Sequence, residues 1–159
     1  SVVYEEPKRL VALGLARATA TATGGRPSTT YGITAKGRRA LRSWLEQPGS
    51  PPVTEFEGLV KVAFADHGSI DGLRANLQAI REFAESELAD VERRLAEYGD
   101  TGGPYPDRLP VITLAVEYFR MQTEALLRWA DWAEEATGNW TGVTTETGAR
   151  VPDGVYSAD

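Results

Sequence analysis

The chain has 159 residues, with 17 Lys and Arg against 23 Asp and Glu, one His, no Cys and 42% hydrophobic residues. This length suits one large or two small domains, and the lack of an 18-residue apolar run or an N-terminal signal segment predicts a soluble, cytoplasmic protein. Zero Cys and the lone His67 exclude disulfides, thiolate or multi-histidine metal sites and Cys nucleophiles, so no cofactor is expected.

The charge is distributed unevenly along the chain. Residues 1–44 contain eight basic and two acidic side chains, a formal charge of +6, whereas residues 45–159 contain nine basic and 21 acidic ones, a formal charge of −12. Such an asymmetry is typical of an electropositive binding surface joined to an acidic body with another role. Two solvated faces of opposite sign are the alternative explanation.

The basic part of the chain predicts a helix, a β-hairpin and a second helix. Apolar residues at helical spacing over residues 3–13 predict a short helix that ends at Gly14, because Gly accepts the left-handed conformation. Two Thr-rich segments, 15–23 and 29–34, predict a hairpin with a basic, flexible tip of five residues between them. Thr34 can then cap the helix that follows.

A Pro-rich segment separates this part from the rest. Residues 47–52 contain three Pro and one Gly, which disfavour both helix and strand. We therefore expect a domain boundary here, between a DNA-binding domain at residues 1–47 and a helical domain at residues 53–159.

Two long amphipathic helices are predicted beyond the boundary. After an apolar segment at 56–64, Ser69 can cap a helix whose apolar residues step by three or four over 70–98. A Gly/Pro-rich turn at 99–110 precedes a second helix with the same stepping. Its stripe consists of Val111, Leu114, Tyr118, Met121, Ala125, Trp129, Trp132 and Ala136. Neither stripe has a partner domain in the chain large enough to bury it, so we expect the two helices to pair with those of a second subunit.

Several short segments occur in an order that resembles the PadR family of transcriptional regulators. They are Val3-Tyr4-Glu5-Glu6-Pro7-Lys8-Arg9-Leu10, Leu13-Gly14-Leu15, Gly25-Arg26-Pro27, Tyr31-Gly32-Ile33-Thr34, Gly37-Arg38, Ala40-Leu41 and Trp44-Leu45. The resemblance implies a mainly α fold with a small β-hairpin wing, that is, a winged helix-turn-helix followed by a long-helix dimerisation domain. The first two helices of the family pattern are missing from this sequence.

The resemblance and the charge together predict an operator-binding surface in residues 1–47. The expected DNA-contacting residues are Ser1, Val2, Tyr4, Glu5, Lys8, Arg9, Arg26 and Ser28. Arg26 is the strongest candidate, because an Arg flanked by Gly can reach into a narrow groove at small steric cost. Lys8 and Arg9 suit phosphate or guanine contacts, and the alternative is a surface helix with solvated charges.

An aromatic cluster on the second long helix is a candidate effector site. Its expected members are Tyr118, Arg120, Trp129, Trp132 and Trp140, whose rings and cation would suit a small, planar aromatic acid. A packed core or dimer interface is the favoured alternative, because aromatic residues at helical spacing most often serve packing.

These expectations combine into one functional prediction. The chain is predicted to be a homodimeric repressor that reads an inverted-repeat operator in double-stranded DNA. The alternative is a helical protein-interaction module without DNA binding. An enzyme is not predicted, because the sequence contains no nucleophile with a base, no metal-ligand cluster and no phosphate loop.

Overall fold

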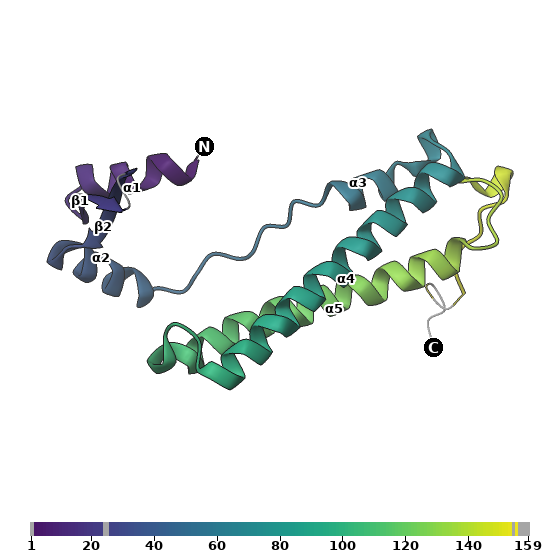
Figure 1. The fold of residues 1–159 in the computed structure, drawn as a ribbon. Helices are drawn as coiled ribbons and strands as arrows, with labels where there is room; N and C mark the ends of the chain where they lie inside the picture. The colour runs from purple at the N-terminus through teal and green to yellow at the C-terminus, as the bar shows by residue number, and fades with distance from the viewer. Residues whose placement is uncertain (1, 24–25, 154, 156–159) are drawn as a thin grey trace. The chain divides into compact units, whose positions relative to one another are not determined.

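The computed structural model describes residues 2–23, 26–153 and 155, and of residues 2–4, 21–23, 26 and 27 it describes the backbone alone. The chain divides into two compact units, Ser1–Val53 and Thr54–Asp159 (Figure 1). The division falls at the end of the Pro-rich segment that predicted a domain boundary. Each unit is described separately below.

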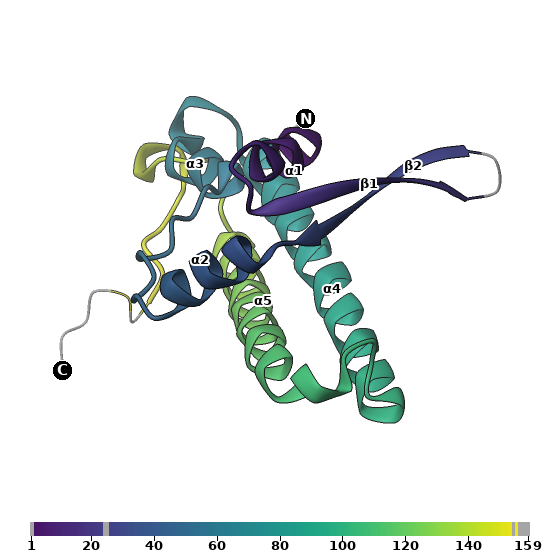
Figure 2. The same cartoon turned by 90° about the vertical axis from the view of Figure 1, so that its left-hand side faces the viewer.

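The first unit is built from two helices and a hairpin. Helix α1 spans Val2–Ala12, strands β1 and β2 span Ala16–Thr23 and Arg26–Ile33, and helix α2 spans Ala35–Leu45. The two strands pair antiparallel and extend as a ribbon from the helices (Figure 2). Gly14 ends α1 with a φ of 69°, as its position predicted.

One threonine joins the elements of this unit. The Thr34 hydroxyl donates to the Gly14 carbonyl at 2.8 Å and accepts from the backbone N–H of Gly37 at 3.0 Å, so it fixes the end of α1 and caps the start of α2. The predicted cap is confirmed. Gly37 is buried where α2 crosses the start of β1, and a Cβ there would lie 2.1 Å from the Leu15 carbonyl oxygen.

The hairpin differs from the prediction at its tip. Strand β2 begins at Arg26 rather than at residue 29, and the ladder pairs Thr23 with Arg26. The predicted five-residue tip is wrong, because the pairing continues until only the sequence Gly24-Gly25 separates the strands, a dipeptide that suits two-residue hairpin connections. Pro27 is tolerated because both strands of a two-stranded sheet are edges.

The second unit is dominated by an antiparallel pair of long helices (Figure 1). A short helix, α3 (Glu57–Ala63), precedes α4 (Ile70–Thr101), which α5 (Leu109–Thr137) follows. The Ser69 hydroxyl accepts from the Gly72 N–H at 3.1 Å, which confirms the predicted cap of α4. Short 3-10 turns at Ala65–His67 (η1), Pro106–Arg108 (η2) and Thr145–Thr147 (η3) complete the unit.

The turn between the long helices is shorter than predicted. Helix α4 continues through Gly99 and ends at Gly102, which has a φ of 71°. Pro110 lies within the first turn of α5. Backbone N–H groups in a first turn have no acceptor within the helix, so the missing N–H of Pro removes no helical hydrogen bond there. The expectation of a turn over 99–110 is therefore wrong at both ends, since Gly99 does not interrupt α4 and Pro110 does not interrupt α5.

The core of this unit lies between α4 and α5. Leu73 and Leu77 of α4 pack against Ala133 of α5, and Leu77 is 1% exposed. The buried residues of α4 are Leu73, Leu77, Ile80, Ala84 and Val91. They belong to the predicted stripe, so the expectation that α4 lacks a partner within the chain is wrong.

Helix α5 turns a different face to α4 than the pattern predicted. Its buried residues are Ala130, Ala133 and Thr137, which are small and allow close helix approach. Val111, Leu114, Tyr118 and Met121 of the predicted stripe are 61%, 74%, 52% and 59% exposed. Helix α5 therefore carries a second apolar face, which α4 does not cover.

Candidate nucleic-acid interface

The exposed side of α1 carries two cations close to glutamates. Lys8 Nζ lies 3.4 Å from Glu5 Oε1, and Arg9 Nη1 lies 3.3 Å from Glu6 Oε1. All four side chains are more than half exposed, so these ion pairs are weak in water and a phosphate can replace either carboxylate. Lys8 and Arg9 are exposed and Glu5 pairs with Lys8 within α1, so the DNA contacts of all three stay predictions.

Several predicted DNA contacts lie at the limits of the described structure. Ser1 is outside the described residues. Val2 and Tyr4 lie in α1, and Arg26 lies in β2, with only their backbones described. Ser28 is an exposed residue of β2. Arg26 and Ser28 thus belong to the ladder rather than to a flexible tip, and their DNA contacts stay predictions.

The ladder register adds Arg17, which is not among the DNA contacts predicted from the sequence. Strand β1 alternates Ala with Arg or Thr, and its register pairs Arg17 with Gly32, Thr21 with Ser28 and Thr23 with Arg26. Because alternate positions share one face of a sheet, the positions of Arg17, Arg26 and Ser28 fall on the same face. Arg17 is exposed. The alternation of Ala with Arg or Thr in β1 is a sequence signal that could have placed Arg17 on the polar face of the hairpin.

Two other cations of this unit hold its elements together. Lys36 Nζ donates to the Leu13 carbonyl at 2.9 Å, and Arg38 Nη1 donates to the Ile33 carbonyl at 3.1 Å. Lys36 therefore neutralises the carbonyl end of α1, which helix geometry leaves unpaired. Some of the basic side chains behind the +6 charge of this region therefore hold its elements together, and others face solvent.

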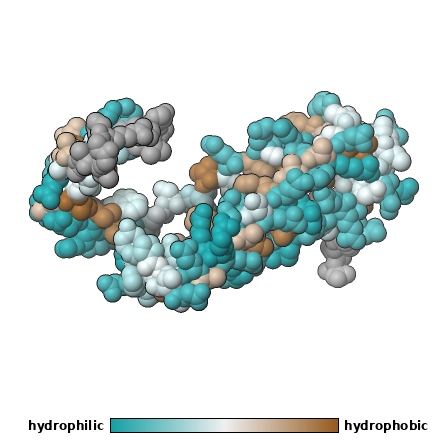
Figure 3. Space-filling view, in the orientation of Figure 1, coloured by the Kyte–Doolittle hydropathy of each residue, from teal (hydrophilic) through white to brown (hydrophobic). Residues whose placement is uncertain are grey.

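The hairpin and helices also leave an apolar groove of about 490 Å³ in the first unit. Leu10, Tyr31, Ile33, Leu41 and Trp44 are among its lining residues, and Figure 3 shows hydrophobic residues at the surface of this unit. The groove lies on the face opposite Arg17 in the ladder alternation, because Tyr31 and Ile33 occupy the other set of positions.

The second unit brings three of the predicted effector residues together. Trp129, Trp132 and Trp140 line a cavity of about 580 Å³ between α3, α4, α5 and the C-terminal tail. Trp129 also packs edge-on against Phe56, with ring centroids 6.4 Å apart. The charged residue among the described lining is Asp66.

Tyr118 and Arg120 are not among the described residues that line this cavity. Arg120 Nε donates to Glu117 Oε2 at 2.9 Å, and its guanidinium also bonds Glu124. The hydrogen bond with Glu117 raises the pKa of Arg120 and lowers the pKa of Glu117. Arg120 is thus paired within α5. Tyr118 packs edge-on against Phe119, with centroids 5.5 Å apart.

The described residues show neither a metal site nor a membrane span. No group of three His, Asp or Glu side chains in this part of the chain could hold a metal ion. Within the same residues, every helix is too short or too polar to cross a bilayer.

A helix–hairpin–helix unit followed by a pair of long antiparallel helices is the fold of PadR-like transcriptional regulators. The structure superposes on BC1756, a PadR-like regulator from Bacillus cereus, with a TM-score of 0.67 and 14% identity over 86% of this chain and 75% of that chain. The fold class predicted from the sequence, mainly α with a hairpin wing, is confirmed. No curated protein sequence matches significantly.

The chain belongs to the family described as the virulence activator alpha C-terminal domain, whose model matches residues 57–137. The virulence activator AphA of Vibrio cholerae is similar in structure, with a TM-score of 0.59 and 24% identity over 82% of this chain and 73% of that chain. PadR of Bacillus subtilis, solved with operator DNA, gives a TM-score of 0.66 and 17% identity over 85% of this chain and 77% of that chain. The same PadR has also been solved with p-coumaric acid.

Proposed function

We propose that the protein is a homodimeric transcriptional repressor that acts in the cytoplasm without enzymatic activity and binds an inverted-repeat operator in double-stranded DNA. The observation that carries the proposal is the first unit, where exposed Lys8 and Arg9 on α1 accompany a hairpin whose polar face includes Arg17. The fold of PadR-like regulators supports this assignment.

Each element has a distinct proposed role on DNA. Helix α1 enters the major groove, where Lys8 and Arg9 contact phosphates or guanine edges. The hairpin follows the sugar–phosphate backbone and the minor groove through Arg17, Arg26 and Ser28. These contacts supply positive charge against phosphate, so binding should weaken steeply with salt.

The dimer interface is proposed to lie on the second apolar face of α5. Val111, Leu114, Tyr118 and Met121 recur at intervals of three or four residues, and each is more than half exposed. A contiguous apolar patch of this kind marks an interaction surface. A two-fold copy covers it with the same patch and holds two DNA-binding units for two operator half-sites about one helical turn apart.

Regulation by a small aromatic ligand completes the proposal. The cavity lined by Trp129, Trp132 and Trp140 has a volume typical of small-molecule sites. A ligand there changes operator affinity only by as much as its own affinity differs between the DNA-binding and other forms of the dimer.

The experiment is a titration of the protein against DNA from upstream of its own gene, at two salt concentrations, with unrelated DNA of equal length as the reference. We expect tighter binding to the upstream DNA and a symmetric footprint. Arg17→Ala should reduce the salt slope by about one for a phosphate contact. Arg94→Ala removes an equal charge from α4 and should leave the slope unchanged.

Equal affinity for both DNAs, or no binding to either, would contradict the proposal. In that case the alternative of a helical interaction module without DNA binding would stand.

A further inference from the structure

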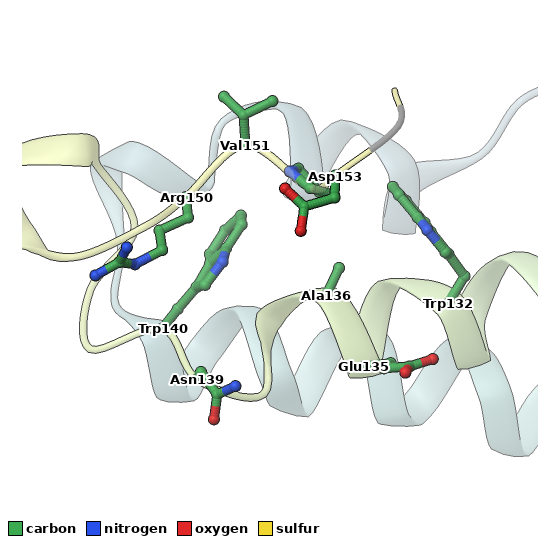
Figure 4. Close-up of a pocket in the computed structure, with 9 residues that line it drawn as sticks. Trp132, Glu135, Ala136, Asn139, Trp140, Arg150, Val151 and Asp153 are labelled. Carbon is green, nitrogen blue, oxygen red and sulfur yellow. The ribbon is translucent and has the colours of Figure 1, made fainter. Parts of the chain in front are cut away.

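The C-terminal tail of the second unit borders a further cavity, which shares Trp132, Ala136, Trp140 and Pro152 with the cavity described above. It has a volume of about 460 Å³ and lies between the end of α5 and residues 150–153 (Figure 4). Trp132 and Trp140 stand on its two sides, with Ala136 below and the Asp153 carboxylate above the space between the rings in this view.

The start of the tail is fixed in place by hydrogen bonds. Arg74 of α4 donates to the carbonyls of Thr137, Gly138 and Trp140 at 3.0, 3.1 and 3.0 Å, so it holds the chain where it leaves α5. A guanidinium at the negative end of a helix is also favoured electrostatically. The cavity is therefore bounded by a hydrogen-bonded segment on the side of α5.

Threonines continue this order along the tail. The Thr141 hydroxyl donates to the Thr147 carbonyl at 2.8 Å, and Thr144 and Thr147 cap each other in η3. Gly142 is buried, and a Cβ there would lie 2.2 Å from Thr147 Oγ1. This close approach sets the path that returns the tail over Trp140.

The charges around the cavity favour a cation. The Asp153 carboxylate forms no hydrogen bond or ion pair with any described residue, and Glu135 is a second carboxylate in the lining. Arg150 also lines the cavity, so the lining carries two carboxylates and one guanidinium, and in Figure 4 the Arg150 guanidinium lies on the other side of the Trp140 ring from Asp153. Residues 54–159 carry nine basic and 20 acidic side chains, which raises the local concentration of cations.

We propose that this cavity binds a small organic cation, of the quaternary or aromatic ammonium class, between Trp132 and Trp140 and beside Asp153. Indole faces attract cations through their negative quadrupole, and a carboxylate above the same space adds to that attraction. A carboxylic acid would meet the Asp153 carboxylate as a like charge, whereas the Glu135 carboxylate points away from the space between the rings in Figure 4. The proposed ligand is therefore opposite in charge to the aromatic acid expected from the sequence. The effect of binding on DNA affinity rests on the proposed function, whereas the binding itself does not.

The test uses benzyltrimethylammonium as the probe and benzoate as a similar ring of opposite charge, with binding to the whole protein measured by calorimetry. We expect benzyltrimethylammonium to bind more tightly than benzoate. Trp132→Leu should weaken its binding by about 2–5-fold, the loss expected for one cation–π contact at an exposed site. Asp153→Asn should weaken it by a similar factor, more at low salt.

Glu146→Gln is the matched control, because it removes one negative charge from the same tail at an exposed residue outside the described lining of the cavity. Equal affinity for benzoate, no binding of either compound, or equal effects of Asp153→Asn and Glu146→Gln would overturn the inference. Operator binding is measured in parallel, with benzyltrimethylammonium present. If the protein binds the operator but not benzyltrimethylammonium, the inference is overturned and the proposed function stands. Probe binding without any operator binding would support the inference and remove the proposed function.

Discussion

Replacing Gly37 with Ala tests whether close packing of α2 holds the first unit together. In an open helix this change stabilises by about 0.5–1 kcal/mol, because Ala loses less backbone entropy on folding. At Gly37 the new Cβ would lie 2.1 Å from the Leu15 carbonyl oxygen and 2.9 Å from Ile33 Cγ1. Neither a backbone carbonyl nor a β-branched side chain can move aside freely, so α2 must shift. Overpacking of this kind costs about 1–3 kcal/mol, which exceeds the propensity gain.

The measurement is urea unfolding followed by circular dichroism, together with operator affinity. Gly99→Ala is the matched control, because Gly99 lies inside α4 with nothing within 4 Å of the added methyl group. We expect Gly37→Ala to lower the free energy of unfolding of the first unit and to weaken operator binding, and Gly99→Ala to raise stability slightly. A Gly37→Ala protein as stable as Gly99→Ala would refute the packing argument.

Three further predictions concern the helical unit. Leu77→Ala should lower the free energy of unfolding by about 2–5 kcal/mol in chemical denaturation, because Leu77 is 1% exposed and its loss opens a cavity; a smaller loss would show that the core collapses around it. Leu114→Asp should leave the helix content unchanged and yield a monomer by light scattering, since Leu114 is 74% exposed within one chain; an intact dimer would remove α5 from the interface. Glu117→Gln should reduce the pH dependence of thermal stability in acid. The hydrogen bond from Arg120 holds the pKa of Glu117 below its usual 4.5. The contribution of this ion pair to stability is therefore present above pH 4.5 and is lost as the pH falls through the lowered pKa. Identical pH profiles for Glu117→Gln and the unchanged protein would contradict this prediction.

Local signals in the sequence were sufficient for the end of α1 and for the starts of α2 and α4. Gly14, Thr34 and Ser69 act through their own backbone or hydroxyl groups on neighbours a few residues away, so their roles follow from position. Gly99 misled because a helix tolerates one Gly in its last turns at a cost of about 1 kcal/mol. The actual end at Gly102 depends on the left-handed conformation there.

The pairing of α5 could not be read from its pattern. The prediction of a buried helix face relies on large apolar residues at helical spacing, and in α5 these lie on the stripe that includes Leu114 and Met121. The face that packs on α4 is made of Ala130 and Ala133, whose small side chains permit close approach but give little hydrophobic signal. A helix with two apolar faces leaves the choice of partner to tertiary packing.

The candidate sites show the same limit. Lys8 and Arg9 were found because they lie on one helix. Arg17 was missed as a contact because its place on the same face of the hairpin as Ser28 and Arg26 depends on the ladder register. The charges that line the tail cavity could not be predicted from the sequence either, since Asp153 and Trp132 line the same cavity only because of the path of the tail.

The hydrogen bonds of Arg74 impose an order on folding during synthesis. Its three carbonyl acceptors follow it by 63 to 66 residues along the chain, so Arg74 is synthesised well before any of them. Closing so long a loop costs entropy that only the docking of α5 on α4 offsets. The Arg74 guanidinium therefore forms these three hydrogen bonds only after α5 has docked on α4, and the start of the tail becomes ordered at that step. A nascent chain released before residue 140 would present α5 with its final carbonyls unbound.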